Sequence, residues 1–252
     1  MSSLMQLHWQ RFKQHKLGFG CFIAFSLIFF LSLGAELIAN DKPLLVKYDH
    51  ALYFPVLKSY PETAFGGVFE TEAEYKDPAV QKLIAEKGWA IWPVIPFSYQ
   101  TPNLELAVPV PSPPSAQNWL GTDDQGRDVL ARILYGLRIS LLFGFALTVL
   151  SAAIGILVGA VQGYYGGWID LIGQRLLEVW SSLPMLFMVL VLVSLFTPNI
   201  YWLFLIMLLF GWTRLVGMVR AEFLRARNLE YVWAARSIGA GDGRIMFRHI
   251  LP

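Results

Sequence analysis

The chain has 252 residues with a formal net charge of +2; 56% of them are hydrophobic and 15% aromatic, and the mean hydropathy is +0.50. A soluble domain of this length is rarely so apolar, so the composition argues against a globular cytosolic protein and indicates a membrane protein. The single cysteine, Cys21, excludes a disulfide framework within the chain.

Long uncharged runs indicate the membrane spans. Residues 17–35, 139–169 and 179–213 carry no charged side chain, over 19, 31 and 35 residues. A bilayer needs about 20 apolar residues per helix, whereas helices of a soluble core are shorter and amphipathic. The last run is interrupted at residues 197–199 and therefore contains two spans. We expect spans at residues 17–38, 139–162, 176–197 and 200–220.

The first span follows a short N-terminal segment, residues 1–16. Its apolar stretch is too long for a cleaved signal peptide and no clear cleavage site follows it, so an uncleaved anchor is favoured. With the N-terminus in the cytoplasm, the cytoplasmic pieces hold 11 basic residues against five acidic ones. Because Lys and Arg accumulate on the cytoplasmic side of spans, we expect this orientation.

Residues 39–137 then form an extracytoplasmic insertion. The insertion holds 11 of the 14 prolines and 12 of the 18 acidic residues, and it is too long to be a plain connection. We expect a short helix from Pro78 with Asp77 as its N-cap. The rest is predicted to be irregular and packed on the membrane surface, and docking of an external partner is the alternative role.

The stretch NWLGTDDQGRDVLARILYGLRISL, residues 118–141, combines a turn with a helix start. Gly121 to Gly126 predict the turn, and Asp128 can cap a short surface helix that leads into the second span. Asp123, Asp124 and Asp128 could also suggest a calcium loop. The remaining oxygen ligands and the terminal Glu are missing, so we expect no metal here.

Small residues recur at every fourth position in the second span, at Ser151, Gly155, Gly159 and Gly163. Such a ridge lets helix backbones approach closely, so this face is expected to pack on protein, either within the chain or in a partner subunit. The Gly-rich stretch 163–175 predicts a tight cytoplasmic turn. Pro184 can kink the third span, for structural reasons or beside a translocation path.

Several catalytic patterns are missing from the sequence. It has no phosphate-binding G-x-x-x-x-G-K-[ST] loop, no H-E-x-x-H and no G-x-S-x-G. No histidine has a metal partner at ligand spacing, and the uncharged runs of the spans contain no acidic residue that would suggest a proton relay. We therefore expect a chain that is not an enzyme and binds no cofactor. If it drives transport, a partner supplies the energy.

Residues 229–252, LEYVWAARSIGAGDGRIMFRHILP, predict two short helices under the membrane. Gly239 and Gly241 should end the first helix, because Gly readily adopts the left-handed terminal conformation, and Asp242 should cap the second. Ala234 and Ala235 make the elbow small enough to enter a groove of another protein. Binding of this basic segment to anionic lipid is the alternative.

These residues resemble the EAA loop of ABC importer permeases, E-A-A-x-x-x-G-x₉-I-x-L-P. Ala234, Ala235, Gly239, Leu251 and Pro252 match its spacing, whereas Trp233 and His249 stand where the pattern has Glu and Ile. The stretches 118–141 and 163–184 are similar to the dipeptide/oligopeptide/nickel branch. ELIANDKPLLVKYD, residues 36–49, and the enlarged insertion are similar to the microcin C and peptide permeases of the Yej type.

The resemblance implies an all-α membrane protein with the type I ABC importer permease fold. Spans two to four, in residues 138–220, would begin the permease domain, and residues 221–252 would form the coupling loop. About four of an expected six membrane helices are then present, so we expect a fragment or a truncated reading frame.

The implied function is that of a permease subunit in the bacterial inner membrane, forming half of a pathway for oligopeptides or peptide-like compounds of the microcin C type. The implied partners are a second homologous permease, a cytoplasmic ABC ATPase that uses ATP, a periplasmic solute-binding protein and the lipid bilayer; no nucleic acid is expected. A membrane sensor or scaffold and an integral-membrane enzyme are the alternatives, but the chain has no soluble signalling domain and no catalytic cluster.

By resemblance, the loop contacts the ATPase and carries the coupling between ATP hydrolysis and the spans. The residues to which this role is carried over are Tyr231, Ala234, Ala235, Gly239, Asp242, Arg244, Arg248, His249, Leu251 and Pro252.

Overall fold

The computed structural model describes residues 2–104, 106, 108–197 and 199–252. The chain divides into two compact units, Met1–Leu141 and Leu142–Pro252. Among the described residues, three helices are long and apolar enough to cross a membrane, and a bent pair of helices would make a fourth span. This agrees with the four spans expected from the uncharged runs.

The first unit begins with α1 (Ser2–Gln14), α2 (Lys16–Leu33) and α3 (Ala35–Ile38). The Nδ1 atom of His15 accepts a 3.0 Å hydrogen bond from the backbone N–H of Gly18 and so caps α2. A break at Gly34 separates α2 from α3. The first span, which was predicted to run without interruption over residues 17–38, is therefore shorter than expected.

The insertion contains a small antiparallel sheet. Its strands are β1 (Leu45–Tyr48), β2 (Ala51–Tyr53) and β3 (Gly88–Ile91), in the order β2-β1-β3. In the register, Val46 lies opposite both Tyr53 and Ala90. Prediction of an irregular insertion missed this sheet, because each strand has only three or four residues and shows no clear alternation.

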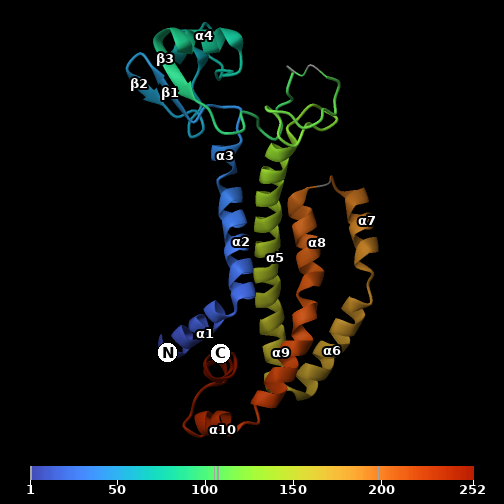
Figure 1. The fold of residues 1–252 in the computed structure, drawn as a ribbon. Helices are drawn as coiled ribbons and strands as arrows, with labels where there is room; N and C mark the ends of the chain where they lie inside the picture. Colours follow the sequence, from blue (N-terminus) through green and yellow to red (C-terminus); the bar gives the residue numbers. More distant parts are fainter. Residues whose placement is uncertain (1, 105, 107, 198) are drawn as a thin grey trace. The chain divides into compact units, whose positions relative to one another are not determined.

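The helix α4 (Pro78–Lys87) packs against β1 and β3 (Figure 1), and it also contacts the 3₁₀ helix η1 (Glu62–Phe65). Asp77 caps α4 as predicted, since its Oδ1 atom accepts a 2.8 Å hydrogen bond from the Ala79 N–H. The core of this part consists of apolar and aromatic side chains centred on Phe65, namely Val46, Tyr48, Phe65, Ala73, Tyr75, Val80 and Ile84.

The helix α5 (Val129–Tyr165) is continuous over 37 residues. Asp128 caps it as predicted, with Oδ1 accepting a 2.7 Å hydrogen bond from the Ala131 N–H. The expected surface helix and second span are thus one helix, because no Pro interrupts the turns between them and the single Gly136 is tolerated inside a helix. Its first turns pack with α3, and the Tyr135 hydroxyl donates to the Ala39 carbonyl oxygen over 2.9 Å.

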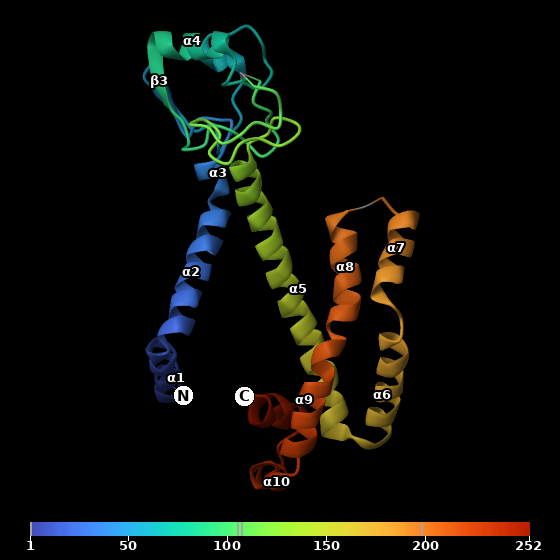
Figure 2. The same cartoon turned by 45° about the vertical axis from the view of Figure 1, so that its right-hand side comes forward.

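The second unit continues from α5 into helices that end in the predicted coupling loop. Figure 2 shows these helices from a second side. Their bounds are α6 (Gly167–Ser181), α7 (Met185–Leu195), α8 (Ile200–Gly211), α9 (Thr213–Ala226), α10 (Glu230–Ser237), α11 (Asp242–Arg244) and the π-helix η2 (Ile245–Ile250).

One break between these helices differs from the expected boundaries and a second agrees with them. The predicted turn at residues 163–175 is reduced to Gly166, and both Gly166 and Gly167 have positive φ, at 64° and 54°. A single sharp turn is possible there because glycine has no Cβ to oppose that conformation. Pro184 follows a break at which α6 and α7 bend by 65°, in keeping with the predicted kink.

Candidate functional site

The small-residue ridge of α5 lies against α9. A Cβ atom added at Gly159 would lie 2.8 Å from the carbonyl oxygen of Val216 and 2.9 Å from the Cβ of Val219. A Cβ at Gly163 would lie 2.6 Å from the carbonyl oxygen of Arg220. Contacts this short with backbone atoms leave no room for a side chain, so the two helix backbones meet directly.

The other two ridge residues extend this contact toward α8. A Cβ at Gly155 would lie 2.7 Å from the carbonyl oxygen of Trp212, and a Cβ at Gly211 would lie 2.9 Å from the Ser151 hydroxyl oxygen. All four ridge positions therefore pack within the chain. The close approach sets the position of α9 and, through it, of the segment that follows.

Two arginines connect α9 to neighbouring helices, Arg220 within α9 and Arg227 directly after it. Arg220 donates through Nε and Nη2 to the carboxylate of Asp170 in the first turn of α6, with the Nη2 to Oδ2 distance 2.6 Å. Arg227 donates through Nη1 to the carbonyl oxygens of Gly163 and Tyr164, each over 3.3 Å. The last carbonyls of α5, which lack a partner within the helix, are thereby satisfied. These hydrogen bonds join the ends of α5, α6 and α9, which we call the frame.

We call residues 229–252 the tail segment. Its first helix, α10, ends as predicted at Gly239, where φ is 82°. The N–H of Gly239 donates to the Arg236 carbonyl oxygen over 3.0 Å, and the N–H of Ala240 donates to the Ala235 carbonyl oxygen over 3.1 Å. These two bonds are the Schellman pattern, in which a left-handed residue reverses the chain after a helix.

Asp242 does not cap the second helix, contrary to the prediction. The N-cap position of α11 is Gly241, which makes no side-chain hydrogen bond there. The Asp242 carboxylate instead accepts a 2.6 Å hydrogen bond from the hydroxyl of Tyr164, at the end of α5. Sequence reasoning favoured local capping because it could not place Tyr164, 78 residues earlier, beside this carboxylate.

The tail segment has an inner face that is buried against the frame. Val232 and Ala235 of α10 and Ile245 and Met246 of η2 are at most 5% exposed. They pack with three residues of α5 and α9, namely Ala160, Tyr164 and Phe223. Burial of these side chains holds α10 and η2 onto the frame, because each removes apolar surface from water.

The outer face of the tail segment is exposed and includes large apolar side chains. Trp233 is 56% exposed, Ile238 is 85% exposed and Phe247 is 49% exposed. Most of the predicted coupling residues are exposed, namely Tyr231, Ala234, Gly239, Asp242, Arg244, Arg248, His249, Leu251 and Pro252. Ala235 is buried in the inner face, so it supports the segment from within instead of facing a partner.

Sequence reasoning missed the residues that hold the tail segment in place. Arg236 donates through Nη2 to the Tyr164 hydroxyl over 3.1 Å, and its guanidinium lies 5.6 Å from the ring centre of Trp233. The Asp170–Arg220 pair carried one usable signal, since opposite charges stood at the ends of neighbouring spans. Tyr164 carried none, because an aromatic residue at a span end is usually read as a membrane-interface residue.

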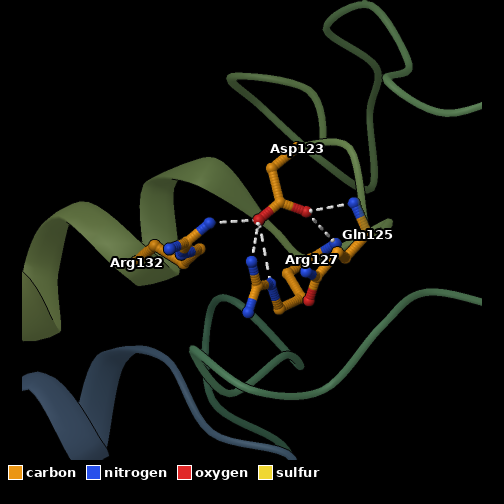
Figure 3. Close-up of polar contacts among 4 residues, drawn as sticks. All are labelled: Asp123, Gln125, Arg127 and Arg132. Carbon is orange, nitrogen blue, oxygen red and sulfur yellow. Dashed lines mark hydrogen bonds and ion pairs between the residues drawn. The ribbon is translucent and has the colours of Figure 1, made fainter.

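A second polar cluster lies outside the spans, before α5 (Figure 3). Asp123 Oδ1 accepts hydrogen bonds from the N–H groups of Gln125 and Arg127, each 2.9 Å, while Oδ2 pairs with the side chains of Arg127 and Arg132. Burial opposes ionisation, but the hydrogen bonds from Arg127 and Gln125 outweigh it and lower the pKa of Asp123 to about 2.

The neighbouring carboxylate is also occupied by protein donors. Asp128 Oδ2 accepts a 2.7 Å hydrogen bond from the side-chain amide of Asn118, whose oxygen accepts one from Asn103 over 2.9 Å. All three side chains are buried. Of the three carboxylates considered for a calcium loop, Asp123 and Asp128 therefore hold the start of α5, whereas Asp124 is exposed.

Two family models match the chain. The model described as "binding-protein-dependent transport system inner membrane component" matches residues 133–252. The model of the N-terminal transmembrane domain of oligopeptide transport permease C matches residues 3–57. The first of these matches contains the ends of α5, α6 and α9 and the whole tail segment.

Curated relatives are similar over most of the chain. It is 52% identical over 252 residues to the inner membrane ABC transporter permease protein YejE of Escherichia coli, covering 100% of this chain and 74% of the relative. It is 48% identical to the peptidoglycan transport system permease protein YejE of Agrobacterium fabrum, over 97% of this chain and 70% of the relative. It is 36% identical to the oligopeptide transport system permease protein OppC of Bacillus subtilis, over 62% of this chain and 50% of the relative.

Proposed function

The chain belongs to the family of peptide-type ABC importer permeases, inner-membrane transport components that are not themselves catalytic, and we propose that its tail segment couples it to the ATPase that drives import. The family works in general with an ATPase and a substrate-binding protein. The specific contact through residues 229–252 is our proposal.

One observation carries it, the two-sided build of the tail segment. Its inner face is fixed to α5 and α9 through Val232 and Ile245, while its outer face exposes Ile238 and Phe247. Exposed apolar side chains on a small rigid segment suit a groove in another protein. A push on that outer face would reach the spans without first deforming the segment, because the buried face is close-packed.

The other subunits of the proposed transporter follow from membership of the same family. A second homologous permease would complete the translocation pathway, and a solute-binding protein would deliver substrate from the extracytoplasmic side. The N-terminus and the tail segment would lie in the cytoplasm, where the excess of Lys and Arg favours them. ATP would be bound by the ATPase subunit, and the permease chain would bind no cofactor.

For the substrate we propose oligopeptides or peptide-like compounds, microcin C included. The support is the similarity to permeases of the Yej type. One Agrobacterium relative is named for peptidoglycan transport, so peptides derived from peptidoglycan are a second candidate. Uptake of each compound by cells with and without the full-length permease separates them: dependence of one and not the other on the permease assigns the substrate.

The coupling role is tested in the full-length permease, co-expressed with the ATPase from the same operon. Ile238→Ser should reduce co-purification of the ATPase and peptide uptake about tenfold, because about one buried apolar side chain is removed from the contact. Ile238 is 85% exposed, so the permease itself should remain folded. Leu104→Ser is the matched control, because Leu104 is 89% exposed in the insertion.

Unchanged ATPase binding and uptake in Ile238→Ser would contradict coupling through this surface. If the unmodified permease itself does not co-purify with the ATPase, the proposal that the two are partners fails. A loss of ATPase binding in Leu104→Ser equal to that in Ile238→Ser would show that the effect is not specific to the tail segment.

A further inference from the structure

A cavity of about 550 Å³ lies between the end of α5 and the tail segment. Tyr164 of α5, Trp233 and Arg236 of α10, Arg227 and Asp242 are among its lining residues. The cavity therefore joins the frame to the segment that the proposed function assigns to ATPase binding. Two arginines against one aspartate give its lining a positive balance.

Arg236 is held in a fixed orientation inside this cavity. Its guanidinium lies 5.6 Å from the ring centre of Trp233 and 5.7 Å from that of Tyr164. One nitrogen, Nη2, donates to the Tyr164 hydroxyl. Cation–π contacts on the faces of a guanidinium leave the N–H groups on its edge available. The Nε and Nη1 groups of Arg236 are not engaged by any residue that the structure describes.

Arg227 is fixed in a different way. Its Nη1 atom donates to the carbonyl oxygens of Gly163 and Tyr164 at the end of α5. Within the described ranges, Nε and Nη2 of this side chain have no hydrogen-bond acceptor. The nearby Asp242 carboxylate is bonded to the Tyr164 hydroxyl instead of to either arginine. Both guanidinium groups thus keep donors for an anion from outside the chain.

We propose that this cavity binds the carboxylate of an Asp or Glu side chain of the ATPase subunit, with Arg236 as its main partner and Arg227 as the second. The inference rests on the proposed coupling function and names the chemistry of the contact. A carboxylate accepts two parallel N–H groups from one guanidinium, and this planar arrangement suits an arginine that is held beside two rings and keeps free N–H groups.

An acidic protein segment fits better than an anionic lipid surface. Trp233 forms a wall of the cavity and is itself 56% exposed on the outer face of the tail segment. A protein seated on that face would therefore cover Trp233 and enter the cavity in one contact. Residues 221–252 carry five arginines against three acidic residues, so they complement an acidic partner surface.

Cross-linking in the assembled transporter tests the contact directly. The full-length permease carrying Arg236→Lys is co-purified with its ATPase and treated with a carbodiimide, which joins a lysine amine to a carboxylate within contact distance. We expect a cross-link from the introduced lysine to one Asp or Glu of the ATPase, located by mass spectrometry. Arg225→Lys is the matched control, because Arg225 is exposed on α9 and pairs with Glu222 outside the cavity.

A second variant measures the strength of the contact. Arg236→Ala should weaken ATPase binding about tenfold, the effect of losing one charge-assisted bidentate pair, and Arg236→Lys should restore part of it. Arg225→Ala should leave binding within about twofold. Reversing the charge of the cross-linked ATPase residue should weaken binding to the unmodified permease and not to Arg236→Ala.

Each other outcome overturns the inference. An intact Arg236→Lys complex with no cross-link to the ATPase, or with cross-linking equal to that of Arg225→Lys, removes the carboxylate contact while the coupling function stands. Arg236→Ala that binds the ATPase normally, but binds vesicles containing an anionic phospholipid less well than the unmodified permease, assigns the cavity to the membrane. Failure of the unmodified permease to bind the ATPase defeats the proposed function itself.

Discussion

The hydroxyl of Tyr164 donates a 2.6 Å hydrogen bond to the carboxylate of Asp242, 78 residues further along the chain. This bond connects the end of α5 to the turn between the two helices of the tail segment. Because Arg236 donates to the same hydroxyl oxygen, one tyrosine links the spans to both sides of the elbow.

Tyr164→Phe should loosen the tail segment while the spans stay folded. Loss of a hydrogen bond to a charged group costs about 1.5–3 kcal/mol when buried, and less here because the partners are partly exposed. Limited proteolysis should cut residues 237–244 faster in this variant. Tyr165→Phe is the matched control, since Tyr165 is 49% exposed; equal cleavage in the two variants would count against the link.

Gly159→Ala should destabilise the packing of α5 on α9. The added Cβ would lie 2.8 Å from the Val216 carbonyl oxygen. Such overpacking lowers the free energy of unfolding by about 1–3 kcal/mol. Thermal unfolding in detergent should show the loss. Gly144→Ala lies on the same helix, where no described atom lies within 4 Å of the added Cβ.

The Gly144→Ala control should be neutral or gain up to about 1 kcal/mol from helix propensity. An equal loss of stability in both variants would mean that the cost comes from the helix itself and not from the contact with α9. Stability unchanged in Gly159→Ala would mean that the two backbones are not in close contact.

Gly239→Val should disrupt the end of α10. The residue has φ of 82°, a conformation that costs an L-residue about 1–2 kcal/mol, and more when it is β-branched. Co-purification of the ATPase with the full-length permease should fall, whereas membrane insertion should not change. Gly241→Val tests the explanation, because Gly241 has φ of −68° and should accept valine.

Space does not distinguish the two glycines, since no described atom approaches an added Cβ within 4 Å at either position. A difference between the variants therefore measures backbone conformation alone. Equal ATPase binding in Gly239→Val and in the unmodified permease would show that the shape of this turn is not needed for docking.

Asp123 should make the fold of the insertion sensitive to acid. Its pKa is lowered to about 2 in the folded chain, so the carboxylate stabilises the fold fully above the pKa of an unfolded Asp, about 4. This contribution is lost as the pH falls from about 4 toward 2. Asp123→Asn should therefore be less stable than the unmodified chain at pH 7, with the difference shrinking below pH 4.

Chemical denaturation of the full chain at several pH values measures this difference. Asp124→Asn is the matched control, because Asp124 is exposed and its side chain makes no hydrogen bond or ion pair with any residue that the structure describes. A difference between Asp123→Asn and the unmodified chain that stays constant from pH 7 to pH 2 would contradict the role of the ionised carboxylate.

Local signals predicted several of these features correctly. Asp77 and Asp128 cap the helices expected of them, and Gly239 ends α10, because each effect depends on residues within four positions. Asp242 was placed wrongly for the same reason, since capping was the local option and its true partner is distant. The short strands of the insertion were not predicted, because pairing between β1 and β3 joins residues about 40 positions apart.

Run lengths of uncharged residues determined that the chain has membrane spans, and spacing determined that Ser151 to Gly163 present one small face. The first property is a length and the second a spacing within one helix, so both can be read from consecutive residues of the sequence. Only the tertiary structure decided that this face meets α9, that Ala235 faces inward, and that Arg227 and Arg236 share one cavity. Those facts depend on how helices that are distant in the sequence pack together. Contacts between distant residues produce no repeating pattern in the sequence from which they could be predicted.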